Sequence, residues 1–492
     1  MTSPMTFRSR VARDTTAVLL AACVAQPVFA QGARLDRTKR PVAGPAPVTR
    51  IPTWTRTKLA NGAELVVSVK NDLPLVSFTL AFVGGATSFE PADKTGVANF
   101  TAQMLSEGTA SKSADDFSNA QQLLGVNLSA SVSNESATIG FTALKDRFDG
   151  ALALAADMLL HPAFPADALE RIRGRTLVSL AQARDNPNAV ASNVFATVNY
   201  GASHPYGRVM TEASVKATTR DDVVAFHQAL FRPGRAVITV VGDVSPVAVK
   251  ASVEKALAAW PAGGERPRFD YPAPPPAAAR TIYLVDKPSA AQSVFQLGHP
   301  GPNRYTPDYY ALQVMNTLLG GLFQSRLNHN IREEKGYSYG VGSGFSYGRG
   351  PGAFNAGGGI VTAKTDSALI EFMKEIRGVQ GAIPFTDDEI RQGKDALVQS
   401  LPRTFSSVSG VRGAISGLYT QDLPERYYQE YAAKVNAVTR DDLVRVAKRY
   451  IQADSLAIII VGDRAMIEAP LRKTGIAPIV VLDANGKLVV VP

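Results

Sequence analysis

Residues 219–243 read TRDDVVAFHQALFRPGRAVITVVGD, and residues 439–463 read TRDDLVRVAKRYIQADSLAIIIVGD. Each stretch begins with a threonine suited to cap a helix, continues as an amphipathic helix, and ends in a buried β-branched strand with a Gly-Asp turn. The two stretches are offset by 220 residues, and Arg171 recurs at the same offset as Arg391. Because one offset holds through several elements, the sequence predicts two homologous halves.

The rest of the chain divides around this repeat. Residues 51–265 are expected to form an N-terminal domain, and residues 281–492 a C-terminal domain. Residues 266–280 are rich in proline and alanine, and proline favours an extended, semi-rigid chain, so they are expected to be the linker. Residues 31–50 are expected to be a flexible lead-in.

Strand and helix patterns interleave within each half. Apolar residues alternate on both sides of Asn134-Glu135, which predicts a β-hairpin over residues 126–143. Helices are predicted over 115–124 and 146–160, and from an N-cap at Thr306-Pro307 to Gly320-Gly321. The predicted fold class is therefore α+β, with two homologous halves that are each an antiparallel sheet flanked by helices.

The composition excludes several classes of protein. The chain has 492 residues, of which 45% are hydrophobic and 19% charged, as in globular proteins. The net charge of +9 is spread along the chain, which argues against a nucleic-acid-binding protein. No apolar run reaches the roughly 18 residues of a membrane span. The one cysteine, Cys23, excludes an internal disulfide and a cysteine-based zinc site.

The N-terminus predicts export. A basic region is followed by the apolar stretch 15–25 and by a small-residue cleavage pattern that ends at Ala30, so residues 1–30 are expected to be a signal peptide. Residues 20–23, LAAC, also resemble a bacterial lipoprotein box, with Cys23 as the lipidated residue. The apolar segment before Cys23 is short, which favours soluble release over a lipid anchor. Both routes end in the periplasm.

Residues 96–109, GVANFTAQMLSEGT, carry a family resemblance. They resemble the zinc helix of the pitrilysin–insulinase metallopeptidases, the inverzincins, in which H-x-x-E-H lies within G-x-A-H-x-x-E-H-M-x-x-x-G-T. In that motif the two histidines bind zinc and the glutamate activates water. The frame is kept here, but the three chemical positions are Asn99, Ala102 and Gln103. These residues are not expected to be ligands.

The resemblance also implies a third ligand, a glutamate near residues 178–180. The chain has no glutamate between Glu170 and Glu212. We therefore expect no metal in this chain, and the resemblance places the zinc on a partner subunit. The sequence His204-Pro205-Tyr206-Gly207 matches a turn common in the family, and its histidine is expected to be structural.

The second half keeps a different family signature. Residues 332–339, REEKGYSY, resemble R-E-x-x-G-x-x-Y. In active relatives the arginine holds substrate backbone or carboxylate groups, and the tyrosine hydroxyl stabilises the tetrahedral oxyanion. The resemblance therefore assigns Arg332 and Tyr339 to catalysis, with Tyr337 less favoured for the hydroxyl role.

Glycines follow this signature directly. Gly340, Gly342 and Gly344 alternate with strand residues rather than forming a loop before a helix, which argues against a phosphate site. Glycine in a strand lets another backbone approach closely. These three glycines are expected to bind a peptide that adds to the sheet as an extra strand. The region resembles the glycine-rich loop in the non-catalytic subunit of the mitochondrial processing peptidase.

The resemblance spans residues 51–485 and implies one arm of a clamshell. It predicts a zinc-free, non-catalytic subunit of a periplasmic metallopeptidase, forming a heterodimer with an H-x-x-E-H-bearing subunit and acting on short or unfolded peptides. The alternative is a homodimeric pseudopeptidase that binds peptides or serves as a scaffold. No Ser-His-Asp or Cys-His arrangement is legible in the sequence, which argues against a self-sufficient enzyme with another chemistry.

Overall fold

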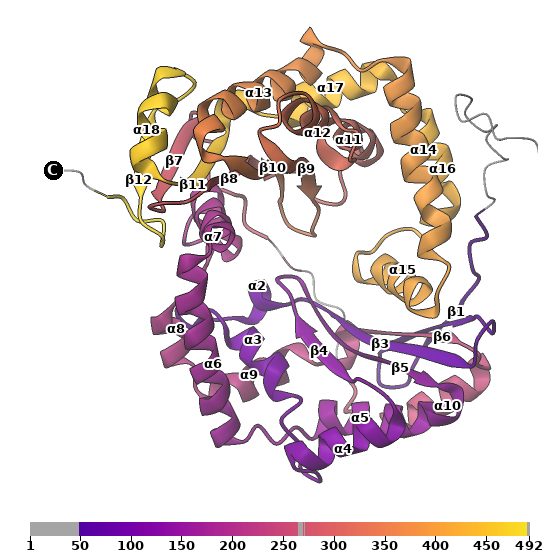
Figure 1. The fold of residues 1–492 in the computed structure, drawn as a ribbon. Coiled ribbons are helices and arrows are strands. Elements are labelled where there is room, and N and C mark those ends of the chain that lie inside the picture. Colours follow the sequence, from indigo (N-terminus) through magenta and orange to yellow (C-terminus); the bar gives the residue numbers. More distant parts are fainter. Residues whose placement is uncertain (1–48, 264–268, 270, 490–492) are drawn as a thin grey trace, which may run out of the picture. The chain divides into compact units, whose positions relative to one another are not determined.

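The structure is a computed structural model that describes residues 49–263, 269 and 271–489 (Figure 1). The predicted signal peptide, Cys23 and the predicted lead-in up to residue 48 lie outside the described residues, as does part of the predicted linker. Within the described ranges, no helix combines the length and the apolar character needed to cross a membrane.

The first half is built on one six-stranded sheet in the order β1-β2-β6-β3-β5-β4. Its strands are β1 (Thr55–Lys58), β2 (Glu64–Val69), β3 (Leu75–Val83), β4 (Ser129–Val132), β5 (Ser136–Leu144) and β6 (Ala236–Gly242). Its helices are α2 (Ala86–Phe89), α3 (Val97–Met104), α4 (Ala114–Leu124), α5 (Phe148–Leu160), α6 (Ala166–Asp185), α7 (Pro187–Tyr200), α8 (Glu212–Ala217), α9 (Arg220–Leu230) and α10 (Pro246–Ala256).

The second half repeats this plan, with its sheet in the order β12-β7-β11-β8-β10-β9. Its strands are β7 (Thr281–Asp286), β8 (Gln292–Gly301), β9 (Ser338–Ser346), β10 (Gly352–Val361), β11 (Ala457–Gly462) and β12 (Ile479–Leu482). Its helices are α11 (Tyr309–Asn316), α12 (Arg326–Asn328), α13 (Thr365–Arg377), α14 (Asp387–Thr404), α15 (Val408–Thr420), α16 (Tyr427–Ala437), α17 (Arg440–Tyr450) and α18 (Arg464–Lys473). Three π-helical segments cover Thr317–Gly321, His329–Glu334 and Gly378–Ala382.

The repeat seen in the sequence is confirmed in the elements. Helices α9 and α17 begin at Thr219 and Thr439, whose side chains each accept a hydrogen bond from the backbone of an aspartate three residues on. Strands β6 and β11, which follow these helices, are buried throughout, as expected for β-branched runs in the centre of a sheet.

The α+β class with two homologous halves is confirmed, but each sheet is mixed where an antiparallel sheet was expected. Strand β6 pairs parallel with β2, and β11 pairs parallel with β7. Strand β12 also pairs parallel with β7. The parallel pairs arise because β6 and β11 return to their sheets after long helical connections, which permit a parallel neighbour where a tight turn does not.

Local predictions hold where the turn chemistry is strong. Strands β4 and β5 form the predicted hairpin, and α4 ends at Gly125 in the left-handed conformation (φ 65°). The predicted N-cap at Thr306 is wrong: α11 begins at Tyr309. The Thr306 hydroxyl instead accepts a hydrogen bond from the Asp308 backbone (3.3 Å), which forms a local turn before the helix.

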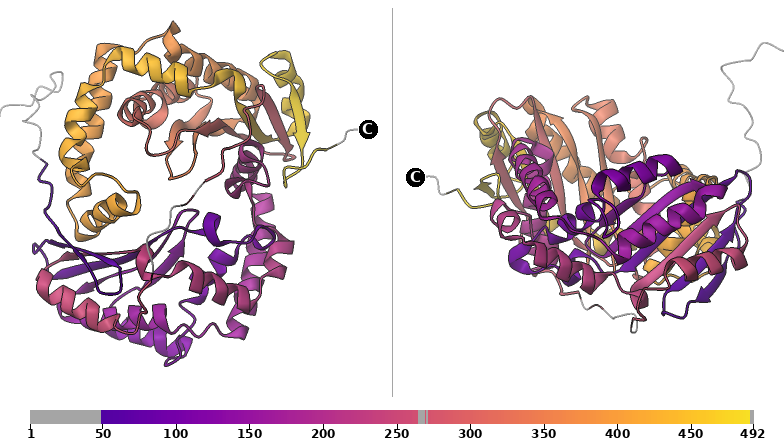
Figure 2. Two further views of the ribbon diagram at one scale, coloured as in Figure 1. Left: turned by 180° about the vertical axis from the view of Figure 1, so that it is seen from behind. Right: turned by 90° about the horizontal axis from the view of Figure 1, so that it is seen from below.

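Each half supplies a helix to the other half's sheet. Helix α15 packs on β3 and β6, where the Arg412 guanidinium donates to the Phe78 carbonyl (3.1 Å). Helix α7 packs on β8 and β11, and its Tyr200 hydroxyl donates to the carbonyl of Gly352 at the start of β10 (2.7 Å). Figures 1 and 2 show α15 against the first sheet and α7 against the second. The two halves are therefore joined by packed helices and not only by the linker.

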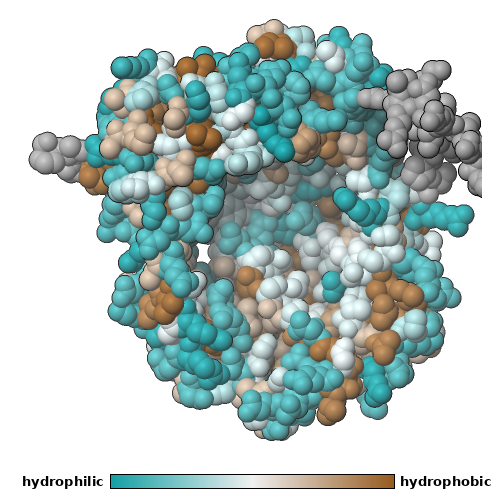
Figure 3. Space-filling model, in the orientation of Figure 1, coloured by the Kyte–Doolittle hydropathy of each residue, from teal (hydrophilic) through white to brown (hydrophobic). Residues whose placement is uncertain are grey.

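The buried side chains form a core in each half and a smaller cluster around α7 and β11. The first core includes Phe78, Phe82 and Phe100, and the second includes Phe354 and Phe372. The outer surface of the face in Figure 3 is mostly hydrophilic, with apolar residues dispersed among polar ones.

Candidate functional site

The zinc-motif segment forms a well-held helix, α3. Gly96 precedes it with φ +118°, a conformation that favours glycine, and a Cβ there would approach Met210 to 3.1 Å. The Glu90 carboxylate accepts hydrogen bonds from the backbone nitrogens of Gly96 (2.7 Å) and Ala98 (2.9 Å). Burial raises the pKa of Glu90, against the effect of these two donors. The frame of the motif is thus structurally intact.

The three chemical positions of this helix hold no metal donor set. Asn99 and Gln103 are exposed one turn apart, and the Gln103 amide donates to the Asn99 side-chain oxygen. Ala102 is buried between them in sequence, with 8% of its surface exposed. Two amides and a methyl group are not the imidazole, thiolate or carboxylate ligands that zinc takes in proteins. The side chains of α3 therefore do not fit the zinc of the inverzincin motif.

The region of the expected third ligand lies on α6, which packs against α3. Val178 is 57% exposed there and supplies no donor atom. Arg171 forms an ion pair with Glu107 at the end of the motif, and the Arg175 guanidinium lies 3.8 Å from the same carboxylate. Among residues 49–263, 269 and 271–489, no three histidine, cysteine, aspartate or glutamate side chains are grouped to hold a metal ion.

Arg332 lies in the π-helical segment His329–Glu334, just before β9. Its guanidinium carbon is 4.3 Å from the ring centre of Phe323, which is itself 63% exposed, and its Nε is 3.4 Å from the Glu333 carboxylate. The backbone nitrogen of Tyr337 donates to the Ile331 carbonyl (2.9 Å). This bond holds the start of β9 beside the segment that carries Arg332.

Tyr339 lies at the start of β9, and 87% of its surface is exposed. No other large apolar or aromatic side chain in the described part of the chain is as exposed. The alternative hydroxyl, that of Tyr337, belongs to a half-buried side chain packed against the core of the second half. The structure thus brings Arg332 and Tyr339 to adjoining elements and presents the Tyr339 ring to solvent.

The glycines of β9 lie on the edge strand of the second sheet. Gly320 permits the π-helical segment to approach this strand, since a Cβ at Gly320 would lie 2.2 Å from the Ser343 nitrogen. Asparagines already contact the strand: the Asn328 side-chain oxygen accepts from Val341 N (3.1 Å), and the Asn316 amide donates to Ser343 O (3.1 Å). Gly340, Gly342 and Gly344 therefore stay predicted binding residues on an edge that these two side chains partly occupy.

His204 has the structural role expected for it. It is 5% exposed, its Nδ1 accepts from the Tyr206 backbone nitrogen (3.1 Å), and its Nε2 is therefore the donor to the Pro272 carbonyl (2.9 Å). Both ring nitrogens are used in the turn, which leaves neither for a metal.

Several side chains that shape these sites were not found from the sequence. Phe323 lies under Arg332, Asn316 and Asn328 bind β9, and Glu90 caps α3. The Gly320-Gly321 pair before Phe323 was the available signal, because it marks the end of the π-helical segment that follows α11. The other partners are brought in by tertiary packing and carry no local signature.

Two protein-family models match this chain. The family described as Insulinase (Peptidase family M16) matches residues 65–211, and the one described as Peptidase M16 inactive domain matches residues 217–397. Among solved structures, the peptidase M16 inactive domain from Pseudomonas fluorescens has a TM-score of 0.77 at 26% identity. That match covers 83% of this chain and 98% of that one.

The relatives that match this chain are named either as zinc proteases or as a non-peptidase homolog. An uncharacterized zinc protease YmxG from Bacillus subtilis is 25% identical over 351 residues, covering 71% of this chain and 84% of the relative. A non-peptidase homolog YmxG from Helicobacter pylori is 24% identical over 400 residues, covering 80% of this chain and 90% of the relative. The chain is thus similar both to a protein named a protease and to one named a non-peptidase.

Proposed function

Because this chain belongs to the M16 peptidase family of insulinase-like proteins, we propose that it is the zinc-free, non-catalytic subunit of a heteromeric metallopeptidase. In this proposal a partner with an intact H-x-x-E-H motif holds the zinc. This chain contributes Arg332 and Tyr339 to a composite site and helps to hold the peptide substrate.

The observation that carries the proposal is the contrast between the two motifs. The α3 positions 99, 102 and 103 hold amide and methyl groups, whereas the Arg332–Tyr339 pair is kept and Tyr339 is 87% exposed. An aromatic side chain left in solvent forgoes the stability that its burial would give. A role toward something outside this chain accounts for that exposure.

The chemistry assigned to this chain uses two kinds of donor. The Arg332 guanidinium, held over Phe323, binds a backbone carbonyl or carboxylate of the substrate through charge-assisted hydrogen bonds. The Tyr339 hydroxyl donates to the oxygen that becomes negative as the peptide carbonyl is attacked. The attacking water is activated on the partner, since the donors on α3 do not fit a metal.

Peptide binding along β9 is the third part of the proposal. A peptide that pairs with this edge bonds to the backbone at Val341 and Ser343, and so displaces the side chains of Asn328 and Asn316 together with the Thr317–Gly321 segment that packs against Ser343. Gly340, Gly342 and Gly344 leave one face of this part of the strand free of Cβ atoms. The substrates proposed are short or unfolded peptides, because only an extended segment pairs with a strand edge.

The site of action proposed is the periplasm. It rests on the predicted signal peptide over residues 1–30, which lies outside the described residues. Release in soluble form and lipidation at Cys23 both place the chain there.

The proposal is tested in the complex of this chain with its zinc-bearing partner. Tyr339→Phe removes one oxyanion donor, and we expect turnover to fall by roughly 10²-fold with the zinc content unchanged. Arg332→Ala is expected to lower kcat/KM at the same zinc content. Arg391→Ala, which removes an exposed arginine of α14, serves as the control. Normal turnover in both site variants would refute the role given to the pair.

The name of the Helicobacter pylori relative, a non-peptidase homolog, favours a second candidate. This is a homodimeric pseudopeptidase that binds peptides or acts as a scaffold without any zinc-bearing partner. It predicts that Arg332→Ala has no catalytic effect in any assembly.

A further inference from the structure

A cavity of about 590 Å³ lies in the second half, and neither α3 nor β9 contributes a residue to its lining. Its walls come from the segment before α11 and the first turn of that helix, from the loop before α16, and from α16 with the start of α17. Ligand pockets in proteins have volumes of about 300 to 1,000 Å³. None of the functions proposed above uses this cavity.

Arg304 lines the cavity and is only 8% exposed. Its guanidinium carbon lies 3.5 Å from the ring centre of Tyr309 and 5.1 Å from that of Tyr427. Throughout the residues that the structure describes, this guanidinium has neither a hydrogen-bond acceptor nor an ion-pair partner. A buried cation is ordinarily paired, since its removal from water is costly, and aromatic faces compensate for only part of that cost.

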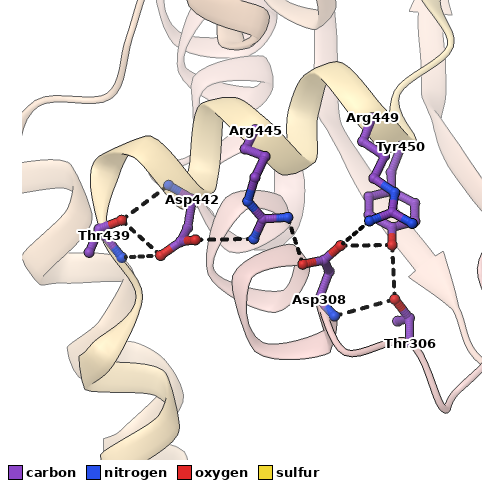
Figure 4. Close-up of polar contacts among 7 residues, drawn as sticks. All are labelled: Thr306, Asp308, Thr439, Asp442, Arg445, Arg449 and Tyr450. Carbon is purple, nitrogen blue, oxygen red and sulfur yellow. Dashed lines mark hydrogen bonds and ion pairs between the residues drawn. The ribbon is translucent and has the colours of Figure 1, made fainter.

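The acidic side chains of the cavity are committed to other partners. Asp308 accepts from Arg445 (2.7 Å), Arg449 (3.2 Å) and the Tyr450 hydroxyl (2.8 Å), as Figure 4 shows. The other two carboxylates of the wall are also paired: Asp442 with Thr439 and Arg445, and Asp422 with Arg349. Arg304 therefore lies in the cavity as a cation, and the three carboxylates of the cavity wall are paired with residues other than Arg304.

The geometry points to a ligand that carries a carboxylate on an apolar body, and we propose that the cavity binds such a ligand. The rings of Tyr309 and Tyr427 lie over the guanidinium, which leaves its edge for a planar acceptor, and a carboxylate matches the guanidinium in two parallel hydrogen bonds. The rest of the wall is largely apolar; it includes Pro307, Leu423, Pro424 and Val438. This inference does not depend on the proposed function.

A carboxylate on an apolar body occurs in two kinds of ligand, the C-terminus of a peptide and a free organic acid. Titration calorimetry on the full chain compares N-acetyl-phenylalanine, its C-terminal amide and 4-phenylbutanoate. We expect both acids to bind and the amide to bind roughly tenfold more weakly or worse, because it lacks the carboxylate. Tighter binding of N-acetyl-phenylalanine identifies a peptide terminus as the ligand, and tighter binding of 4-phenylbutanoate a free acid. Equal binding of acid and amide, or no binding of either acid, would overturn the proposal.

Variants locate the binding. Arg304→Gln removes the charge and is expected to abolish binding of both acids. Ala437→Trp places a bulky ring at an exposed position of the cavity wall, leaves Arg304 in place, and is expected to abolish binding as well. Ala433→Trp, at an exposed position one turn earlier on α16 and outside the cavity wall, is the matched control and is expected to bind as the wild type does. Unchanged binding in Ala437→Trp would place the ligand elsewhere and contradict the assignment.

Discussion

At the scale of single residues, the two family motifs differ: the chemical positions of the zinc motif are replaced, whereas the arginine and tyrosine of the second motif are present. Asn99 and Gln103 satisfy one another by a hydrogen bond on the surface of α3, so these positions are now ordinary helix-surface residues. Arg332 keeps a defined position over Phe323, and Tyr339 keeps an exposed one. The side chains at positions 99, 102 and 103 do not fit a zinc ion, and in the proposed function Arg332 and Tyr339 act on a substrate held with a partner chain.

A buried histidine gives this chain a specific response to acid. His227 on α9 donates through Nε2 to the Leu159 carbonyl (2.9 Å) and stacks on Phe231. Burial lowers the pKa of His227 from 6.5 to about 4. The unfolded chain therefore binds a proton between pH 6.5 and 4 that the folded chain does not, and stability falls as the pH falls through this range.

We expect this one residue to cost roughly 2–3 kcal/mol of unfolding free energy between pH 7 and pH 4.5. His227→Gln keeps an N–H donor for Leu159 but does not titrate. Urea unfolding at the two pH values measures the effect, and the loss of stability on acidification is expected to be smaller in the variant by that amount. An equal loss in both proteins would show that His227 is not the group responsible.

At the scale of elements, the contact between the Thr317–Gly321 segment and β9 depends on glycine. A Cβ at Gly320 would lie 2.2 Å from the Ser343 nitrogen, which is backbone and has little room to move. We expect Gly320→Ala to destabilise the fold by roughly 1–3 kcal/mol through overpacking. Thermal unfolding measures this directly.

Gly413 on α15 provides the matched comparison. It is exposed in a helix interior, and a Cβ there meets no atom within 4 Å. Gly413→Ala is expected to stabilise the protein by about 1 kcal/mol, since alanine has the higher helix propensity. If Gly320→Ala were also neutral or stabilising, the tight approach of β9 would be refuted.

The geometry of α3 predicts that histidines placed at positions 99 and 103 would bind zinc. Residues 99 and 103 lie on one exposed face, where their present side chains touch. In Asn99→His/Gln103→His the two imidazoles lie one turn apart, the spacing of a zinc-binding pair. We expect this variant to bind Zn²⁺ roughly tenfold or more tightly than the wild type, with Asn99→His alone as control. Equal zinc binding in all three proteins would contradict the placement of the motif on α3.

The elements most readily predicted were those with strong local signals. The Thr219 and Thr439 helix starts, the hairpin at β4 and β5, and the end of α4 at Gly125 follow from capping and turn chemistry. The parallel strand pairs were not predicted because they depend on tertiary contacts. The start of α11 at Tyr309 was missed because the Thr306 hydroxyl forms a local turn before the helix. The candidate sites show a similar division: Arg332 and Tyr339 are located by a motif, whereas the contacts of Phe323 with Arg332 and of Arg304 with Tyr309 and Tyr427 have no motif.

At the scale of the whole molecule, the two homologous halves exchange helices. Helix α7 of the first half packs on the second sheet, and α15 of the second half packs on the first sheet. This arrangement makes the halves one structural unit that carries an altered zinc helix in one half and the Arg332–Tyr339 pair in the other.

In the proposed assembly, a second, zinc-bearing chain completes the site. The most direct measurement is gentle affinity purification of the tagged full-length chain from its own host, followed by native mass spectrometry and zinc analysis of the product. We predict a stoichiometric second subunit of the same family with an intact H-x-x-E-H motif and one zinc per pair of chains. Elution as a homo-oligomer without zinc would contradict the claim and identify the chain as a pseudopeptidase.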